Sequence, residues 1–115
     1  MAVVIYHNPR CSKSRETLAL LTAKGIKPKI IEYLASPPTS SELKGLLKKL
    51  GMSPRDLMRK KEAVYAKLGL GKPGLSDDAL VKAMVENPVL IERPIVVNGA
   101  KAALGRPPEA VKAIL

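Results

Sequence analysis

The sequence predicts an α/β fold in which a mixed sheet is interrupted by a helical insertion at about residues 37–88. Three observations lead to this prediction. Apolar, β-branched runs occur near both ends of the 115-residue chain, helix start and stop signals fill its middle, and strand and helix patterns alternate at its beginning. The length suits one compact domain, so we expect a single domain over residues 1–115.

The first third of the chain has a strand–helix–strand pattern. Residues 3–6 are apolar and β-branched, which predicts a buried strand, and an Asn-Pro pair then breaks it. From Ser12 apolar residues recur at helical spacing as far as Gly25, which is suited to end a helix. Residues 30–34 predict a second strand. This order is a βαβ unit, which implies a right-handed parallel crossover.

The middle of the chain carries helix signals. Thr39 followed by Glu42 is a capping-box pattern, which predicts a helix that continues to about Gly51. Three further helices are expected: one begins at Ser53-Pro54, one spans residues 62–68, and one runs from Ser76 to the Asn-Pro pair at 87–88.

The last part of the chain returns to strands. Residues 95–97 are apolar and β-branched, Asn98-Gly99 is a hairpin signal, and residues 100–104 would form the returning strand. Pro107 then opens a last helix that reaches residue 115. The complete order, β-α-β, helical insertion, β-β-α, is that of a thioredoxin-like sheet with an insertion.

Composition limits the possible partners. Basic residues outnumber acidic residues by 20 to 10, which allows nucleic acids, anionic membranes or small oxyanions as partners. There are no interleaved aromatic residues and no base-reading motif, so we expect no nucleic-acid partner. No apolar run approaches the roughly 18 residues of a membrane span, and the N-terminal segment does not resemble a signal peptide. With a single cysteine, this pattern favours a cytoplasmic protein.

The stretch HNPRCSKSR, residues 7–15, contains the only histidine and the only cysteine. Cys11 follows a predicted strand and precedes a predicted helix, whose N-terminal N–H groups stabilise anions such as a thiolate. A lone cysteine is more often an inert apolar residue, but polar neighbours on both sides argue against that interpretation. Position 14, three residues on, is a serine, and the chain has no second cysteine. A disulfide formed by Cys11 must therefore join it to another molecule.

A helix end alone is too weak to activate this thiol. Lowering a thiol pKa by about two units requires about 2.7 kcal/mol of preference for the thiolate. An exposed helix N-terminus supplies about 0.3–1 kcal/mol, and a partly buried one up to about 2 kcal/mol. Another positive group must therefore lie close to Cys11. His7, Arg10 and Arg15 are the local candidates, and the remaining arginines are more distant ones.

Segments along nearly the whole chain resemble the glutathione/glutaredoxin-dependent arsenate reductases: YHNPRCSKSRETL, IIEYLASPPTSSEL, SPRDLMRKKEAVY, SDDALVKAMVENPVLIERPIVV and LGRPPEAV. The resemblance implies a thioredoxin-like fold with a helical insertion. It implies that Cys11 is the nucleophile that attacks arsenate, and that His7 and Ser14 tune its pKa. The implied activity is arsenic detoxification by a monomeric enzyme without a bound cofactor or metal, with glutathione as co-substrate and glutaredoxin as protein partner.

The resemblance also implies a substrate site. Asn8 belongs to the Cys11 loop, and three arginines are implied to bind the oxyanion: Arg59, Arg93 and Arg106. Pro94 matches the cis-proline that precedes the third strand in thioredoxin-like proteins. The alternative is a regulator of this fold that binds RNA polymerase and uses a Cys-x-x-Cys switch. The Cys-x-x-Ser spacing and the three arginines favour the reductase over this regulator.

Overall fold

A computed structural model describes residues 2–115. Its contacts divide these residues into two compact units, one made of residues 2–36 and 93–115 and the other of residues 37–92. The second unit corresponds to the predicted helical insertion, which ends at residue 92 and not at about 88.

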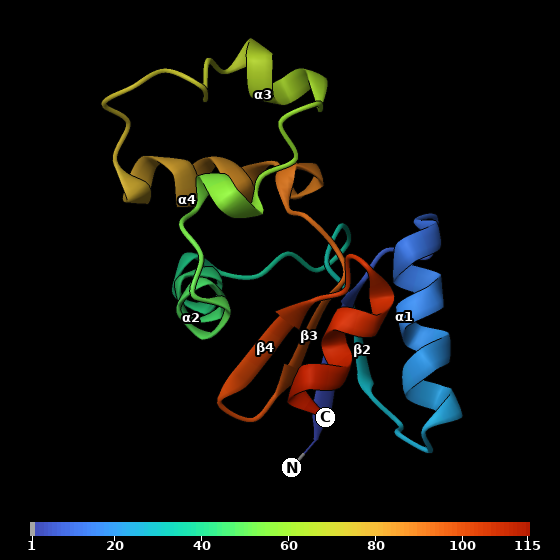
Figure 1. Ribbon diagram of the computed structural model, residues 1–115. Helices are drawn as coiled ribbons and strands as arrows, with labels where there is room; N and C mark the ends of the chain where they lie inside the picture. The colour runs from blue at the N-terminus through green and yellow to red at the C-terminus, as the bar shows by residue number, and fades with distance from the viewer. Residues whose placement is uncertain (1) are drawn as a thin grey trace. The chain divides into compact units, whose positions relative to one another are not determined.

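The first unit is built on a mixed four-stranded sheet (Figure 1). Its strands are β1 (Val3–His7), β2 (Lys29–Glu32), β3 (Ile95–Asn98) and β4 (Lys101–Leu104), in the order β2-β1-β3-β4. β1 is parallel to β2 and antiparallel to β3, and β3 is antiparallel to β4. A parallel neighbour requires a crossover, which α1 (Ser12–Ala23) supplies. The predicted thioredoxin-like sheet is therefore confirmed.

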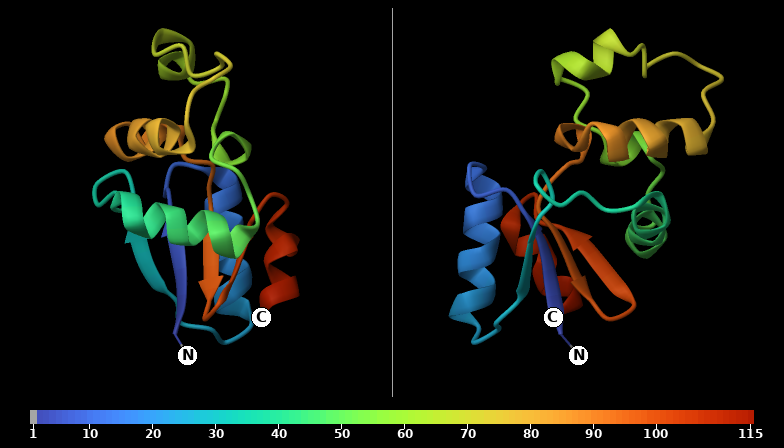
Figure 2. Two further views of the ribbon diagram at one scale, coloured as in Figure 1. Left: turned by 90° about the vertical axis from the view of Figure 1, so that its left-hand side faces the viewer. Right: turned by 180° about the vertical axis from the view of Figure 1, so that it is seen from behind.

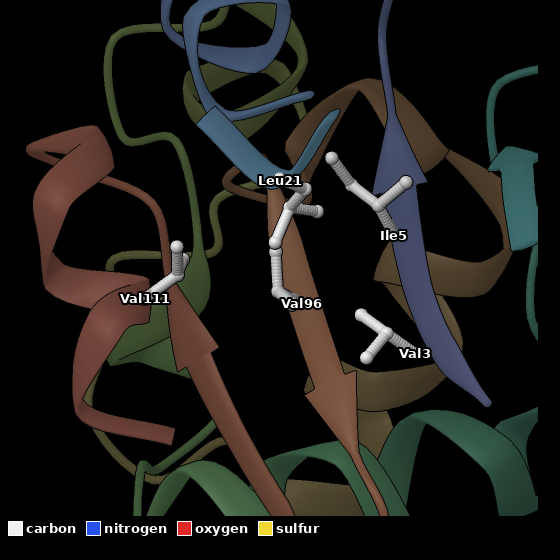
Figure 3. Packing of buried hydrophobic residues seen from close by; sticks show 5 residues of the cluster. All are labelled: Val3, Ile5, Leu21, Val96 and Val111. Atoms are coloured by element: carbon white, nitrogen blue, oxygen red, sulfur yellow. The ribbon is translucent and has the colours of Figure 1, made fainter. Parts of the chain in front are cut away.

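The core of the first unit is aliphatic and lies between the sheet and two helices. Five buried side chains from β1, α1, β3 and the 3-10 helix η3 (Pro108–Ile114) form it: Val3, Ile5, Leu21, Val96 and Val111 (Figure 3). The chain has no Phe and no Trp, so close packing of branched aliphatic side chains fills this space.

Several strand boundaries and one helix type differ from the sequence prediction. β2 ends at Glu32 because the N–H groups of Ala35 and Ser36 both donate to its carbonyl, which turns the chain early. Asn98 pairs with Lys101, so the hairpin loop is Gly99-Ala100, with Gly99 at φ 63 in the position that favours glycine. The last helix is η3, a 3-10 helix and not an α-helix.

The second unit contains three α-helices, α2 (Ser40–Leu50), α3 (Ala63–Lys67) and α4 (Asp77–Glu86) (Figure 2). The predicted capping box is present, because Glu42 N–H donates to Thr39 Oγ1 and Thr39 N–H donates to the Glu42 carboxylate. The helix expected at Ser53-Pro54 is reduced to one 3-10 turn, η1 (Arg55–Leu57).

The segment after η1 pairs with the end of the insertion. Met58 forms an antiparallel bridge with Ile91, which follows the 3-10 helix η2 (Pro88–Leu90). Both bridge residues are buried, as are the flanking Leu57 and Leu90. Among residues 2–115, the helices are all too short or too polar to cross a bilayer.

The core packing predicts a difference between two leucines of the first unit. Leu21 is fully buried, whereas Leu34 is 44% exposed. Leu21→Ala removes packed methyl groups and leaves a cavity, so we expect it to lower the free energy of unfolding by about 2–5 kcal/mol. Leu34→Ala should change it by less than about 1 kcal/mol. Urea titration measures both values, and a similar small loss for the two variants would contradict this description of the core.

Candidate active site

Cys11 is the N-cap residue of α1. Its backbone is extended, with φ −94 and ψ 124, its N–H donates to the Asn8 carbonyl (3.0 Å), and its own carbonyl accepts from Arg15 N–H (3.0 Å). The Cys11 side chain makes no capping hydrogen bond, but the nearby N–H groups of Ser14 and Lys13 help to lower the pKa of the thiol. The first turn of α1 therefore surrounds the thiol with donors that have no partner inside the helix.

Side chains of the loop hold its shape. Ser14 Oγ lies 2.6 Å from His7 Nδ1 and accepts a hydrogen bond from Asn8 N–H (3.0 Å). Asn8 Oδ1 accepts from Arg10 N–H (3.0 Å), and Arg15 Nη1 donates to the Pro9 carbonyl (2.9 Å). His7, Asn8 and Ser14 are buried. These contacts fix the path of residues 7–15, and Ser14 reaches the sulfur through its backbone.

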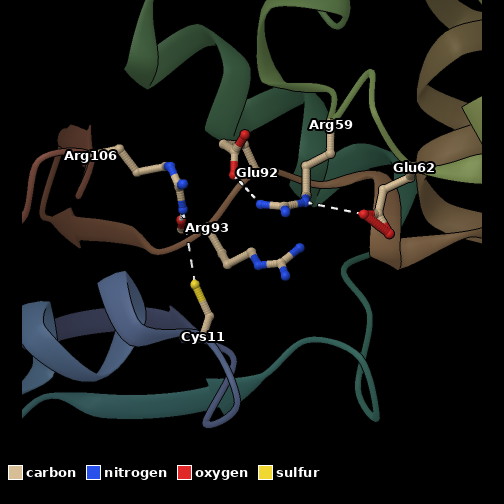
Figure 4. A network of polar contacts seen from close by, with 6 residues as sticks. All are labelled: Cys11, Arg59, Glu62, Glu92, Arg93 and Arg106. Atoms are coloured by element: carbon tan, nitrogen blue, oxygen red, sulfur yellow. Dashed lines mark hydrogen bonds and ion pairs between the residues drawn. The ribbon is translucent and has the colours of Figure 1, made fainter.

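The sheet register brings Arg93 and Arg106 to Cys11. Tyr6 at the end of β1 pairs with Ile95 at the start of β3, and Ile95 pairs with Leu104 at the end of β4. Residues just beyond these pairs therefore lie at the same end of the three strands. Arg106 Nη1 lies 3.9 Å from the Cys11 sulfur (Figure 4), and the nearby Arg93 guanidinium helps to lower the pKa of the thiol.

The connection to Arg106 is held against the Arg93-Pro94 segment. The Arg93–Pro94 peptide bond is cis, which confirms that prediction, and the Arg106–Pro107 bond is also cis. Arg106 Nη1 donates to the Arg93 carbonyl (3.2 Å), and Gly105 N–H donates to the Pro94 carbonyl (2.9 Å). Two hydrogen bonds therefore tie the chain on both sides of the cis-proline.

The surroundings of Cys11 favour the thiolate. Burial raises the pKa of the Cys11 thiol, but hydrogen bonds from Ser14 N–H, from the Arg93 guanidinium and from Lys13 N–H, together with the charge of Arg93, outweigh it. The net effect lowers the pKa below its ordinary value. Arg93 thus adds to the helix N-terminus a positive group that favours the thiolate.

His7 does not supply that positive charge. Burial is the main influence on its imidazole; Glu32, its neighbour on β2, opposes burial, and Arg15 adds to it, so that the pKa of His7 falls below 6.5. The ring is therefore neutral at neutral pH. Of the other two local candidates, Arg15 donates to the Pro9 carbonyl and Arg10 is exposed. His7 contacts Ser14, and its role in tuning the pKa of Cys11 stays a prediction.

Arg59 belongs to the second unit, where two carboxylates hold it. Its Nη1 donates to Glu92 Oε1 (2.7 Å), and its Nε lies 3.6 Å from Glu62 Oε2 (Figure 4). Neither glutamate was predicted to be a site residue from the sequence. The spacing of Glu62, three residues after Arg59, could have indicated an ion pair, whereas the contact with Glu92, 33 residues away, carries no local signal.

Gly105 was also missed as a packing position. A Cβ at this residue would lie 2.5 Å from Thr17 Oγ1 and 2.7 Å from Pro94 Cγ. The close approach of the β4 end to α1 and Pro94 therefore depends on the small size of residue 105. Among residues 2–115, no group of three or more His, Cys, Asp or Glu side chains is placed to hold a metal ion.

Because the charge of Arg93 helps to lower the pKa of Cys11, the thiol should ionise at a lower pH than an ordinary cysteine. We expect the rate of Cys11 alkylation by iodoacetamide to reach half of its plateau at a lower pH in the folded protein than in denaturant. Arg93→Gln keeps a donor but removes the charge, so its midpoint should move upward. Identical midpoints for the folded and denatured protein would contradict the description of this site.

Burial of His7 predicts a second titration. The imidazole should stay neutral at neutral pH and titrate below 6.5, which its single pair of ring NMR signals can report. Because the unfolded chain binds this proton more readily, the contribution to stability is complete above about pH 6.5 and falls as the pH decreases. Titration of His7 above its ordinary pKa would contradict the prediction.

The chain is similar to known proteins over nearly its whole length. The ArsC family matches residues 6–114. An uncharacterized Escherichia coli protein, YfgD, is 56% identical over 98% of this chain and 96% of its own length. An arsenate reductase of Haemophilus influenzae is 54% identical over the full length of both chains. The solved structure of an arsenate reductase from Vibrio cholerae has a TM-score of 0.98 at 59% identity and covers 100% of this chain and 98% of its own.

The extent of these matches decides the family. They include both parts of the sheet unit and the whole helical insertion, and the identities are far above those at which only the fold is shared. Taken together with the cysteine, the cis-proline and the arginines described above, they place this chain in the ArsC family.

Proposed function

We propose that this protein reduces arsenate to arsenite, with Cys11 as the nucleophile and with glutathione and glutaredoxin as the source of electrons. The observation that carries the proposal is the position of the Cys11 sulfur. It lies at the N-terminus of α1. Arg93, which precedes β3, and Arg106, which follows β4, lie close to it. A thiolate and an oxyanion need the same kind of environment, namely oriented N–H donors and planar guanidinium groups.

The proposed reaction begins with attack of the Cys11 thiolate on arsenic. A sulfur–arsenic bond forms, and one arsenate oxygen leaves as water after protonation. The glutathione thiolate then attacks the Cys11 sulfur, so that a disulfide forms and the electron pair of the sulfur–arsenic bond stays with arsenic. Arsenic is thereby reduced from the +5 to the +3 state, and the two sulfurs are oxidised.

The product of that step is a disulfide between Cys11 and glutathione. The chain has no second cysteine, so an external thiol must reduce this disulfide, which is the role proposed for glutaredoxin. A serine at position 14 also argues against a regulator that works through two cysteines. Its hydroxyl contacts His7 and Asn8 and thus has a place in the loop.

The substrate site is proposed to use Arg93, Arg106 and Arg59, with Asn8 shaping the loop below it. The first two arginines lie in the same unit as Cys11, and the contribution of Arg59 rests on the family resemblance. The reducing thiols that this chemistry requires are available in the cytoplasm, which is the location we propose.

The function is tested by arsenate-dependent NADPH oxidation in a coupled assay with purified protein, glutathione, glutaredoxin and glutathione reductase. We expect turnover only when all components are present, and we expect Cys11→Ser to abolish it because a serine hydroxyl stays protonated at neutral pH.

Asp78→Ala is the control variant. It breaks an exposed ion pair with Lys44 (2.7 Å) in the second unit and should leave the rate of arsenate reduction unchanged. Arsenate reduction by Cys11→Ser at the wild-type rate, or no reduction by the wild-type protein with both thiol reagents present, would contradict the proposal.

A further inference from the structure

We propose that Glu92 is a positioning residue for Arg59, and that it keeps the Arg59 guanidinium in the orientation needed to bind the oxyanion. This inference rests on the proposed function, which assigns Arg59 to substrate binding. It concerns contacts within the second unit only, where Arg59, Glu62 and Glu92 all lie.

The backbone places Arg59 and Glu92 on two segments that are joined by the isolated Met58–Ile91 bridge. Arg59 N–H donates to the Leu90 carbonyl (2.7 Å), and Glu92 N–H donates to the Leu57 carbonyl (2.8 Å), on either side of the Met58–Ile91 bridge. In this register Arg59 and Glu92 are diagonal neighbours, a separation that long side chains can span. Two backbone hydrogen bonds therefore fix the two Cα positions from which the ion pair forms.

The side-chain contact is short and partly buried. Arg59 Nη1 lies 2.7 Å from Glu92 Oε1, and the side chains are 24% and 22% exposed. The Lys44–Asp78 pair in the same unit has the same 2.7 Å distance, but its side chains are 53% and 80% exposed. Reduced exposure weakens solvent screening, so the Arg59–Glu92 contact should restrict its arginine more strongly than a surface pair restricts its lysine.

Glu62 supports the same arginine from a second side. Its carboxylate lies 3.6 Å from Arg59 Nε, and its N–H donates to the Arg59 carbonyl (3.2 Å). Nε and Nη1 thus both lie beside carboxylates, which restricts the orientation of the guanidinium. The longer distance and the absence of a hydrogen-bond geometry at Nε make Glu62 the weaker of the two contacts.

An oriented arginine binds an oxyanion more tightly than a mobile one because less side-chain entropy is lost on binding. Removal of Glu92 would have two opposite effects on oxyanion binding. Arg59 would be less ordered, which weakens binding, and the site would lose one negative charge, which strengthens the attraction of an anion. We infer that orientation dominates, because recognition by a guanidinium depends on its planar fork.

The test compares Glu92→Ala with Glu92→Gln in the coupled assay. Glu92→Ala removes the acceptor, and we expect the KM for arsenate to rise on the order of tenfold with kcat reduced less. Glu92→Gln keeps an oxygen that accepts from Nη1, and it should return the KM to within about threefold of the wild-type value. In an Arg59→Ala background, Glu92→Ala should add no further loss.

Asp78→Ala serves as the matched control, because it removes one carboxylate from an ion pair of equal length in the same unit and should leave the KM unchanged. Thermal unfolding of all variants reports any general loss of stability. An unchanged KM in Glu92→Ala, or equal increases in Glu92→Ala and Glu92→Gln, would overturn the positioning role.

A second measurement separates this inference from the proposed function. Calorimetric titration of arsenate into Cys11→Ser, with glutamate, glutamine or alanine at position 92, measures oxyanion binding without turnover. Weaker binding with alanine but not with glutamine supports the positioning role even if the wild-type protein reduces no arsenate. Equal binding by the three proteins, or no binding by any of them, would overturn it.

Discussion

The attraction between the Cys11 thiolate and the N-terminus of α1 is the interaction on which the rest of the site depends. Cys11 is the N-cap residue and has an extended backbone, so its thiol lies close to the N–H groups of Lys13 and Ser14, which favour the thiolate. This geometry needs a fixed loop between β1 and α1. The buried contacts of Ser14 with His7 and Asn8 provide that fixed loop without using the sulfur itself.

The sheet supplies the part of the site that the loop cannot. Antiparallel pairing of β1 with β3 and of β3 with β4 brings Arg93 and Arg106 to the edge at which β1 ends. The two arginines are also linked to each other through the Arg93 carbonyl. Stabilisation of the thiolate and the proposed binding of an oxyanion would thus use the same two of the six arginines.

Much of the fold followed from local patterns. The capping box at Thr39 and the strand at residues 3–6 are each encoded in a few adjacent residues, and the structure confirms them. It also confirms the helical insertion, which extends to residue 92. The hairpin loop was misplaced by one residue because Asn98 pairs with Lys101 and its side chain donates to the Ile114 carbonyl. That second contact joins residues far apart in the sequence, where no local pattern reports it.

The site was less accessible to sequence reasoning. The need for a distant cation could be inferred from the small effect of a helix end, but the choice among arginines came from resemblance. The contributions of Ser14 and Lys13 come from their backbone, which any residue supplies. The contacts of Glu92 and Gly105 depend on tertiary packing, and their residue types alone do not indicate a role.

The central claim is that electrons reach arsenic through the Cys11 sulfur. Intact-mass measurement during a single turnover tests it most directly. Protein, arsenate and glutathione are mixed without glutaredoxin, quenched with acid and measured, followed by peptide mapping. We expect one glutathione to accumulate as a disulfide on Cys11 only when arsenate is present, and arsenite to appear in an equal amount. Arsenite formation with Cys11 unmodified, or a glutathione adduct that forms equally without arsenate, would contradict it.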